Sequence, residues 1–275
     1  MRGQCMAGGT AMARTGSEDT LARGSFVRAL RAEALKSRHG APVRLAIVLA
    51  LPFPLLAAFV ALSVPQFGLS YSPWNYWYAL LMPVSITLIA ATVANADARL
   101  GNHTLLSSGV PLHLAWGAKV AWCLALLLLS NLVVFAVYAV MSFVVPQGAA
   151  SMSAMLAVAL ALTVMGSWMI PATHFLTMRV GMLAGVFVPL AVQLALSLGW
   201  SVVPFWPACP PAATIVLPTA FLPVLPSGEP ASPGMVLVES ISQGPDVALA
   251  LIVAAVLTAA LTAAGAVWLD RSEEL

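Results

Sequence analysis

The longest apolar stretch of the chain runs from about residue 152 to residue 203 and is interrupted only by THFLTMRVG at 173–181. A helix needs roughly 20 apolar residues to cross a bilayer, because in hydrocarbon the backbone must satisfy its own hydrogen bonds. The stretch is too long for one crossing. It therefore predicts two antiparallel spans, 152–175 and 180–203, joined by a tight turn.

Four further segments have the length of a span, namely 43–64, 75–96, 116–144 and 247–269. Hydrophobic residues make up 61% of the chain and charged residues only 8%, whereas soluble domains are about 25% charged. We therefore expect an all-α, polytopic membrane protein with six transmembrane helices.

The distribution of basic residues predicts the orientation. If the N-terminus lies inside, the inner segments are 1–42, 97–115, 176–180 and 270–275. All twelve Lys and Arg residues lie in these segments or within about one helical turn of them. The predicted outer loops are about 65–74, 145–151 and 204–246. Their only charged residues are Glu229, Glu239 and Asp246. Because cytoplasmic loops are enriched in Lys and Arg, both termini are predicted to be cytosolic.

The N-terminal region divides into two parts ahead of the six-helix domain at 41–275. Residues 1–24 read as a disordered tail, and 25–40 as an amphipathic helix. The apolar stripe of this helix contains Phe26, Val27, Leu30, Ala34 and Leu35, and its flanks carry Arg28, Arg31, Lys36 and Arg38. This pattern is typical of a helix that lies on the inner leaflet. On the other side, the stiff, proline-rich loop at 204–245 is expected to pack on the outer ends of the spans.

Several function classes are excluded by missing chemistry. The net charge of +2 does not indicate nucleic-acid binding, and no zinc-ligand spacing or P-loop occurs. The centres of the predicted spans carry no ionisable residue, which argues against ion-coupled transport. The remaining polar candidates, Asn131, Ser167 and Gln193, either bond helices together or line a translocation path. The chain is therefore not expected to be an enzyme or to hold a cofactor.

The segment between the second and third spans is unusually polar. LGNHTLL at 100–106 can form a short amphipathic helix that ends at SSGVP, 107–111. It is either a connecting loop or a docking helix for a partner that supplies energy. The absence of an internal energy source favours the docking helix.

A family resemblance points the same way. RAEALK at 31–36, WYALLMP at 77–83, RLGNHTLLSSGVP at 99–111 and LPSGEP at 225–230 resemble stretches of ABC-2-type exporter permeases. Within these, the chain looks like the lantibiotic immunity permeases of the MutE/EpiE/MutG group. The resemblance extends over about 25–270.

The resemblance implies a bacterial cytoplasmic-membrane complex of two permeases and two copies of an ABC ATPase, with ATP and Mg²⁺ bound by the ATPase. The second permease would be identical or paralogous, and the substrate would be an amphipathic peptide expelled from membrane lipid. The ATPase would contact the helix before the first span and the loop after the second. The expected docking residues are Arg28, Arg31, Glu33, Lys36, Arg99, Leu100, Gly101, Asn102, His103, Leu105, Leu106 and Pro111.

Two other interpretations stay open. A non-catalytic membrane scaffold or assembly protein would also lack buried charges. A permease of the same type could instead export another amphiphile, such as a drug or a lipid.

Overall fold

Five helices are long and apolar enough to cross a membrane in the computed structural model, which describes residues 26–38, 40–98, 111–232, 234–242 and 245–272. They are Ala41–Ser63, Ser72–Ala96, Leu112–Val144, Met152–Arg179 and Asp246–Arg271. Within the described ranges every regular element is helical, apart from one isolated β-bridge between Val224 and Pro230. The chain is therefore an all-helical protein with the character of a multi-pass membrane protein.

The predicted fifth span, 180–203, is a shorter helix, α10 (Met182–Leu198). Its 17 residues give a length of about 26 Å at 1.5 Å per residue, somewhat less than the roughly 30 Å of a hydrocarbon core. The helix ends where Gly199 leads into the 3₁₀ turn η3 (Trp200–Val202). α10 packs against α9 (Met169–Arg179) across a turn at Gly181, which has a φ of 124°. The predicted hairpin is present, but six spans remain a prediction.

The first span is built from two helices, α2 (Ala41–Val48) and α3 (Pro52–Ser63). Pro52 and Pro54 have no backbone N–H, so the helical hydrogen bonds are interrupted between the two helices. Ser130 of α7 (Leu112–Val144) donates its hydroxyl to the carbonyl oxygen of Ala46 at 2.9 Å. The third span thereby satisfies a backbone acceptor just before the break.

The second span changes its helical geometry near its beginning. It consists of α4 (Ser72–Tyr76), a π-helical turn η2 (Trp77–Leu81) and α5 (Met82–Ala98). The fourth span also has two parts, α8 (Met152–Gly166) and α9, which meet at a turn through Ser167 and Trp168. Such local departures from α-helix are tolerated in a membrane where neighbouring helices cover the backbone.

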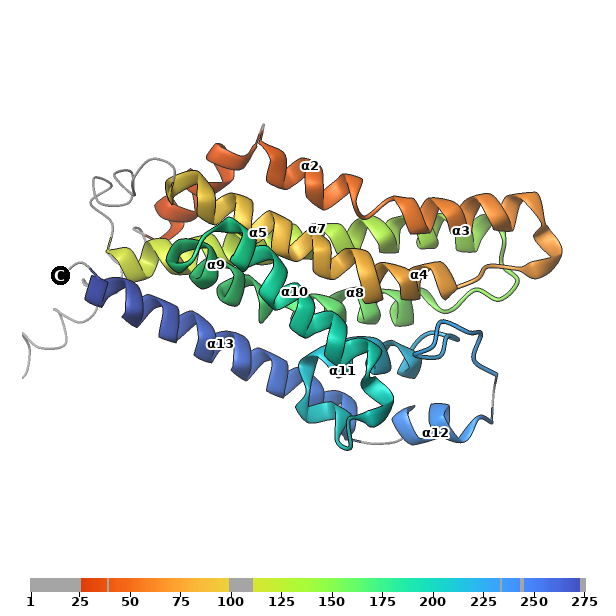
Figure 1. Cartoon of the computed structure of the whole chain (residues 1–275). Coiled ribbons are helices and arrows are strands. Elements are labelled where there is room, and N and C mark those ends of the chain that lie inside the picture. Colours follow the sequence, from red (N-terminus) through yellow and green to blue (C-terminus); the bar gives the residue numbers. More distant parts are fainter. Residues whose placement is uncertain (1–25, 39, 99–110, 233, 243–244, 273–275) are drawn as a thin grey trace, which may run out of the picture.

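The spans define two ends of the molecule (Figure 1). At the end that we call the basic end, α2 and α7 begin, and α5, α9 and α13 (Asp246–Ser272) terminate. At the opposite end, the loop end, α3 and α7 terminate, α4 and α8 begin, and the loop before α13 lies. The first described segment and the C-terminal end of α13 therefore share the basic end. That this end faces the cytosol stays a prediction.

The proline-rich loop folds back onto the bundle as short helical segments. These are η4 (Trp206–Ala208), α11 (Pro210–Val216), η5 (Leu217–Ala220) and α12 (Val236–Ser242). The two prolines that begin α11 occupy its first turn, where their missing N–H groups cost nothing. Residues 210–219 are completely buried, and α11 packs against α8, α10 and α13. The loop is thus part of the bundle and not a separate domain.

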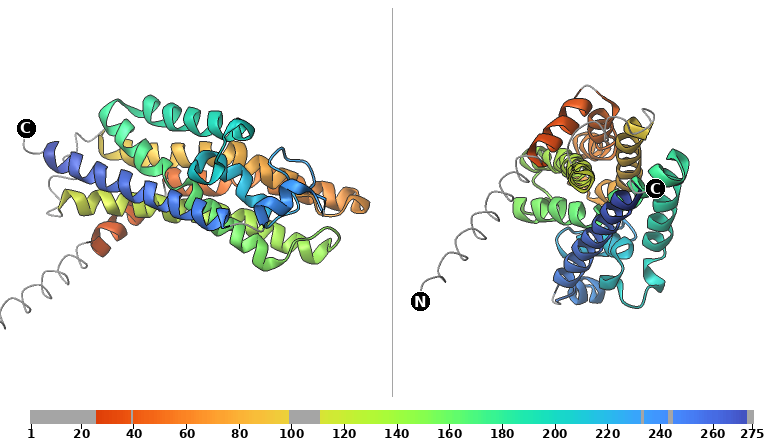
Figure 2. Two further views of the ribbon diagram at one scale, coloured as in Figure 1. Left: turned by 90° about the horizontal axis from the view of Figure 1, so that it is seen from below. Right: turned by 90° about the vertical axis from the view of Figure 1, so that its left-hand side faces the viewer.

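α13 is the most peripheral span. It crosses the other helices obliquely (Figure 2) and contacts α7, α8 and α9. Only 11% of its most apolar window is buried within the chain, compared with 67% for the fourth span. The indole of Trp116 occupies the space where a side chain at Gly265 would lie, and its Nε1 donates to the carbonyl of Thr262 at 3.0 Å. A glycine is therefore required for α13 to approach α7.

Candidate functional site

A short helix precedes the first span at the basic end. Residues 26–37 are helical, and the ring of Phe26 lies over Gly117 near the beginning of α7. Val27 and Leu35 remain exposed, whereas Glu33 and Ser37 are buried. The helix therefore turns a polar side toward the bundle and leaves part of its apolar stripe uncovered.

The buried side of this helix is held by an ion pair. Glu33 Oε1 lies 3.0 Å from Lys119 Nζ of α7, and their side chains are only 9% and 3% exposed. The half-exposed Lys36 reaches the same carboxylate oxygen at 3.1 Å. Removing charges from water is costly and is repaid only by close pairing. This carboxylate thus fixes the helix before the first span to the third span.

Two further titratable side chains lie behind the ion pair. Cys123 Sγ is 3.8 Å from His174 Nε2, and His174 Nδ1 is 3.1 Å from the carbonyl oxygen of Ile170. That carbonyl can only accept, so the arrangement favours a proton on Nδ1 and leaves Nε2 as the acceptor for the thiol. The ring of Trp116 meets His174 edge-on, with ring centroids 5.8 Å apart. Together with Trp116, these residues join helix 26–37, α7, α9 and α13 into one buried cluster.

This buried cluster does not have the composition of a metal centre. Among the described residues, no three His, Cys, Asp or Glu side chains group closely enough to hold a metal ion. Both Cys123 and His174 are buried and belong to spans that pack against each other. The arrangement favours a role in joining helices.

The exposed part of the basic end is strongly cationic. Arg28, Arg31, Lys36 and Arg38 are exposed on and just after the short helix. The exposed Arg44, Arg179 and Arg271 belong to α2, α9 and α13, three of the helices that begin or end here. We call these seven residues the basic surface. Among the described residues of this end, the exposed acid Asp270 lies 3.8 Å from His113 Nδ1. Such a surface suits the headgroups of anionic lipids or an acidic face on a partner protein.

The expected docking residues fall into three groups. Arg28, Arg31 and Lys36 belong to the basic surface, and Pro111 is exposed at the N-terminal cap of α7. Glu33 is buried in the ion pair, so any docking role that it has would act through the position of the helix. The residues outside the described part of the chain are Arg99, Leu100, Gly101, Asn102, His103, Leu105 and Leu106.

The three polar candidates for a translocation path are all buried. Asn131 accepts a hydrogen bond from Trp77 Nε1 and donates one to Thr163 Oγ1, both at 3.1 Å. The hydroxyl of Ser167 bonds that of Thr258 at 2.6 Å, and Gln193 Nε2 donates to the carbonyl of Pro211 at 3.4 Å. These are the contacts expected of residues that bond helices together. A role in transport stays a prediction.

The Glu33–Lys119 pair and the contact between Cys123 and His174 were not predicted from the sequence. The available signal was that Lys119 is the only cation well inside α7, and Glu33 the only acid in the basic helix. Two isolated opposite charges next to an apolar bundle are candidates for mutual pairing.

Comparison with known proteins adds no relative. No protein-family model, no curated protein and no solved structure matches this chain. The resemblance to ABC-2-type permeases therefore rests on the motifs quoted above.

Proposed function

We propose that the chain is a membrane-spanning permease subunit of an ABC exporter and that a separate ATPase drives it. The observation that carries the proposal is the basic helix at 26–37, which the buried Glu33–Lys119 ion pair ties to the third span. A force applied to this helix would be transmitted directly to α7. The chain lacks a P-loop of its own, so the energy has to come from a partner.

The substrate would be an amphipathic peptide of the lantibiotic type, removed from the bacterial cytoplasmic membrane for self-immunity. Two ATPase subunits with ATP and Mg²⁺, and a second permease chain, would complete the complex. The support is the motif resemblance together with a bundle that partitions into the bilayer as such a substrate does. Another amphiphile, such as a drug or a lipid, is the alternative substrate. A non-catalytic scaffold is the alternative function.

The docking role is tested by purifying the full chain with its proposed partner, a P-loop ATPase to be sought among the neighbouring genes. Reversing the charges of Arg31 and Arg38 should reduce co-purification and peptide-stimulated ATP hydrolysis several-fold. Arg271→Glu reverses an exposed charge of the basic surface on α13, so it shows whether any loss is specific to the short helix before the first span. A second variant replaces 100–106 with Gly and Ser. Association unchanged in both variants would contradict the docking role.

The transport role needs a separate measurement. Cells with and without the complex are exposed to several lantibiotics, and the complex is expected to raise the tolerated concentration of at least one. Equal sensitivity would contradict the immunity function. A stable complex that moves neither peptides nor drugs in proteoliposomes would favour the scaffold.

A further inference from the structure

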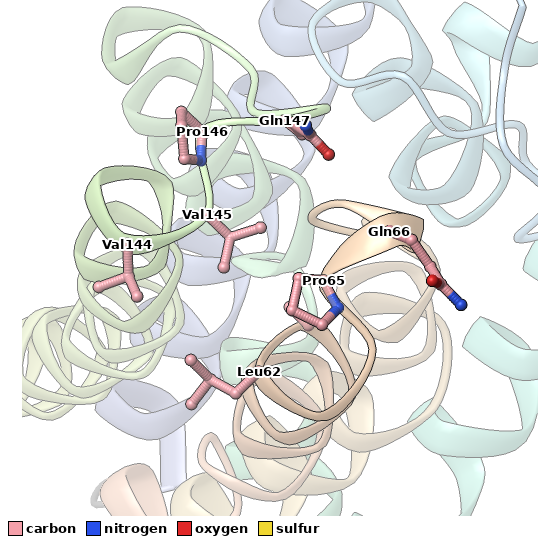
Figure 3. Close-up of a pocket in the computed structure, with 8 residues that line it drawn as sticks. Leu62, Pro65, Gln66, Val144, Val145, Pro146 and Gln147 are labelled. Atoms are coloured by element: carbon pink, nitrogen blue, oxygen red, sulfur yellow. The ribbon is translucent and has the colours of Figure 1, made fainter.

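An open cavity of about 440 Å³ lies at the loop end, between the ends of the first and third spans. It is lined by Ala61, Leu62, Pro65, Gln66, Val144, Val145, Pro146 and Gln147. In Figure 3 the side chains of Leu62, Pro65 and Val145 face the space between the two chain segments, and Gln66 and Gln147 lie to one side of it. Pockets that bind small ligands have volumes of roughly 300–1,000 Å³.

The two loops that close the cavity are fixed to each other. The amide of Leu69 donates to the carbonyl of Gln147 at 2.8 Å. Gly68, with a φ of 66°, approaches so closely that a Cβ would lie 2.7 Å from that carbonyl oxygen. Tyr71 strengthens the junction, since its hydroxyl accepts a hydrogen bond from the amide of Ala150 at 2.7 Å. The cavity is therefore formed before any ligand arrives.

The lining changes from apolar to polar along the helix axes. Ala61, Leu62 and Val144 belong to α3 and α7, which end at Ser63 and Val144, whereas Gln66 and Gln147 follow those ends. No ionisable residue lines the cavity. A ligand that fits this order has an apolar chain beside the helices and uncharged acceptors beyond them.

The surroundings indicate where such a ligand comes from. Leu62 and Val144 are each 57% exposed, and Phe59 and Phe143 nearby are more exposed still. On helices that cross a membrane, such side chains face hydrocarbon, so the cavity opens toward lipid. From this we propose that the cavity binds one acyl chain of a membrane glycerolipid from the leaflet at the loop end. The amide N–H groups of Gln66 and Gln147 would then donate to its ester carbonyls.

This assignment is independent of the proposed transport function, because it requires only that α3 and α7 cross the membrane. The test uses the full chain in nanodiscs that contain phosphatidylcholine with a photoreactive diazirine on one acyl chain, followed by peptide mapping. A diazirine a few methylenes below the ester should label 61–62 and 144, because five helical residues span only about 7.5 Å. One near the ester should label 65–66 and 146–147.

Two substitutions should remove the labelling by filling the cavity. Leu62→Trp and Val144→Trp are each expected to reduce it at least about tenfold, because each methylene displaced from an apolar site weakens binding roughly fourfold. Leu55→Trp and Val140→Trp are matched controls, since these residues are 51% and 61% exposed on the same two helices but do not line the cavity. Both controls should label like the wild type.

The results separate a binding site from general contact with lipid. Labelling spread evenly along α3 and α7, or unchanged in both cavity-filling variants, would overturn the proposal. Two independent variants are used so that a folding defect in one, detected by size-exclusion chromatography, leaves the other as the test. The double variant Gln66→Ala/Gln147→Ala should lose labelling by the ester-proximal probe. Unchanged labelling there would overturn the assignment of the amides to the ester carbonyls.

Discussion

The basic end of the bundle is fastened by a buried ion pair, whereas the loop end is fastened by uncharged hydrogen bonds. At the basic end, Glu33 holds the short helix against Lys119. At the loop end, Asn75 Nδ2 donates to the hydroxyl of Tyr78 at 2.8 Å and to the carbonyls of Leu225 and Pro226 at 3.3 and 3.4 Å. The proline-rich loop is thereby tied to the second span.

The two kinds of interaction differ in the group that is left unpaired when one partner is removed. An unpaired charge in a buried site costs several kcal/mol, whereas an unpaired neutral group costs roughly 1–3 kcal/mol. The basic end should therefore hold its helix in an all-or-none manner. The loop end should weaken in smaller steps.

The largest effect is expected from Lys119→Met. The substitution leaves the Glu33 carboxylate buried with only the half-exposed Lys36 beside it, so we expect a loss of about 3 kcal/mol in the free energy of unfolding. Denaturant titration in detergent measures this loss. The double variant Glu33→Gln/Lys119→Met removes both charges and should recover most of it. A double variant no more stable than Lys119→Met would show that the pairing of charges is not what matters.

A smaller effect is expected from Asn75→Ala at the loop end. The change removes the donor to three acceptors, including the buried hydroxyl of Tyr78, and should cost about 2 kcal/mol. The loop at 221–232 should also become sensitive to proteolysis. Asn95→Ala is the control, because Asn95 Nδ2 donates a weak hydrogen bond to the sulfur of Met182 at 3.5 Å. Equal sensitivity of the two variants would argue against a tether at Asn75.

The smallest effect concerns pH at the loop end. Burial raises the pKa of Tyr71 above its ordinary value of 10.0, and the hydrogen bond from Ala150 partly opposes this. The phenol of Tyr71 therefore loses its proton at lower pH in the unfolded chain than in the folded chain. The contribution of Tyr71 to the free energy of unfolding is therefore fully present below pH 10 and is lost as pH rises through the pKa of the folded state. Unfolding of the wild type and of Tyr71→Phe should be compared between pH 9 and pH 11. A decline that is equally steep in both proteins would exclude Tyr71 as its source.

Much of the fold could be predicted from the sequence, because a span is specified by length and apolar composition alone. The predicted 43–64 and 247–269 differ by two residues or fewer at either end from the observed Ala41–Ser63 and Asp246–Arg271. α10 was harder to delimit, since Gly199 ends the helix inside an apolar stretch that continues to Val203. Hydropathy does not report where such a helix stops.

The burial of Lys119 could not be predicted for a related reason. The third span was predicted to begin at 116, which places Lys119 close enough to the membrane surface to extend into water. The helix begins at Leu112, directly after Pro111, so Lys119 lies about two turns inside it. Which acid meets this lysine depends on how the short helix folds back, and pairing between segments 86 residues apart leaves no periodic signal.

The π-helical turn of the second span makes the number of residues there as important as their kind. Three consecutive side chains, Trp77, Tyr78 and Ala79, are all buried, which a single face of an α-helix does not permit. The wider turn directs Trp77 to Asn131. On the other side, Asn75 donates hydrogen bonds to the hydroxyl of Tyr78 and to the carbonyl of Leu225 in the proline-rich loop. One α-helical residue corresponds to a rotation of about 100°. Deleting one residue from 77–81 would turn one part of the span against the other and separate the contacts with α7 from those with the loop.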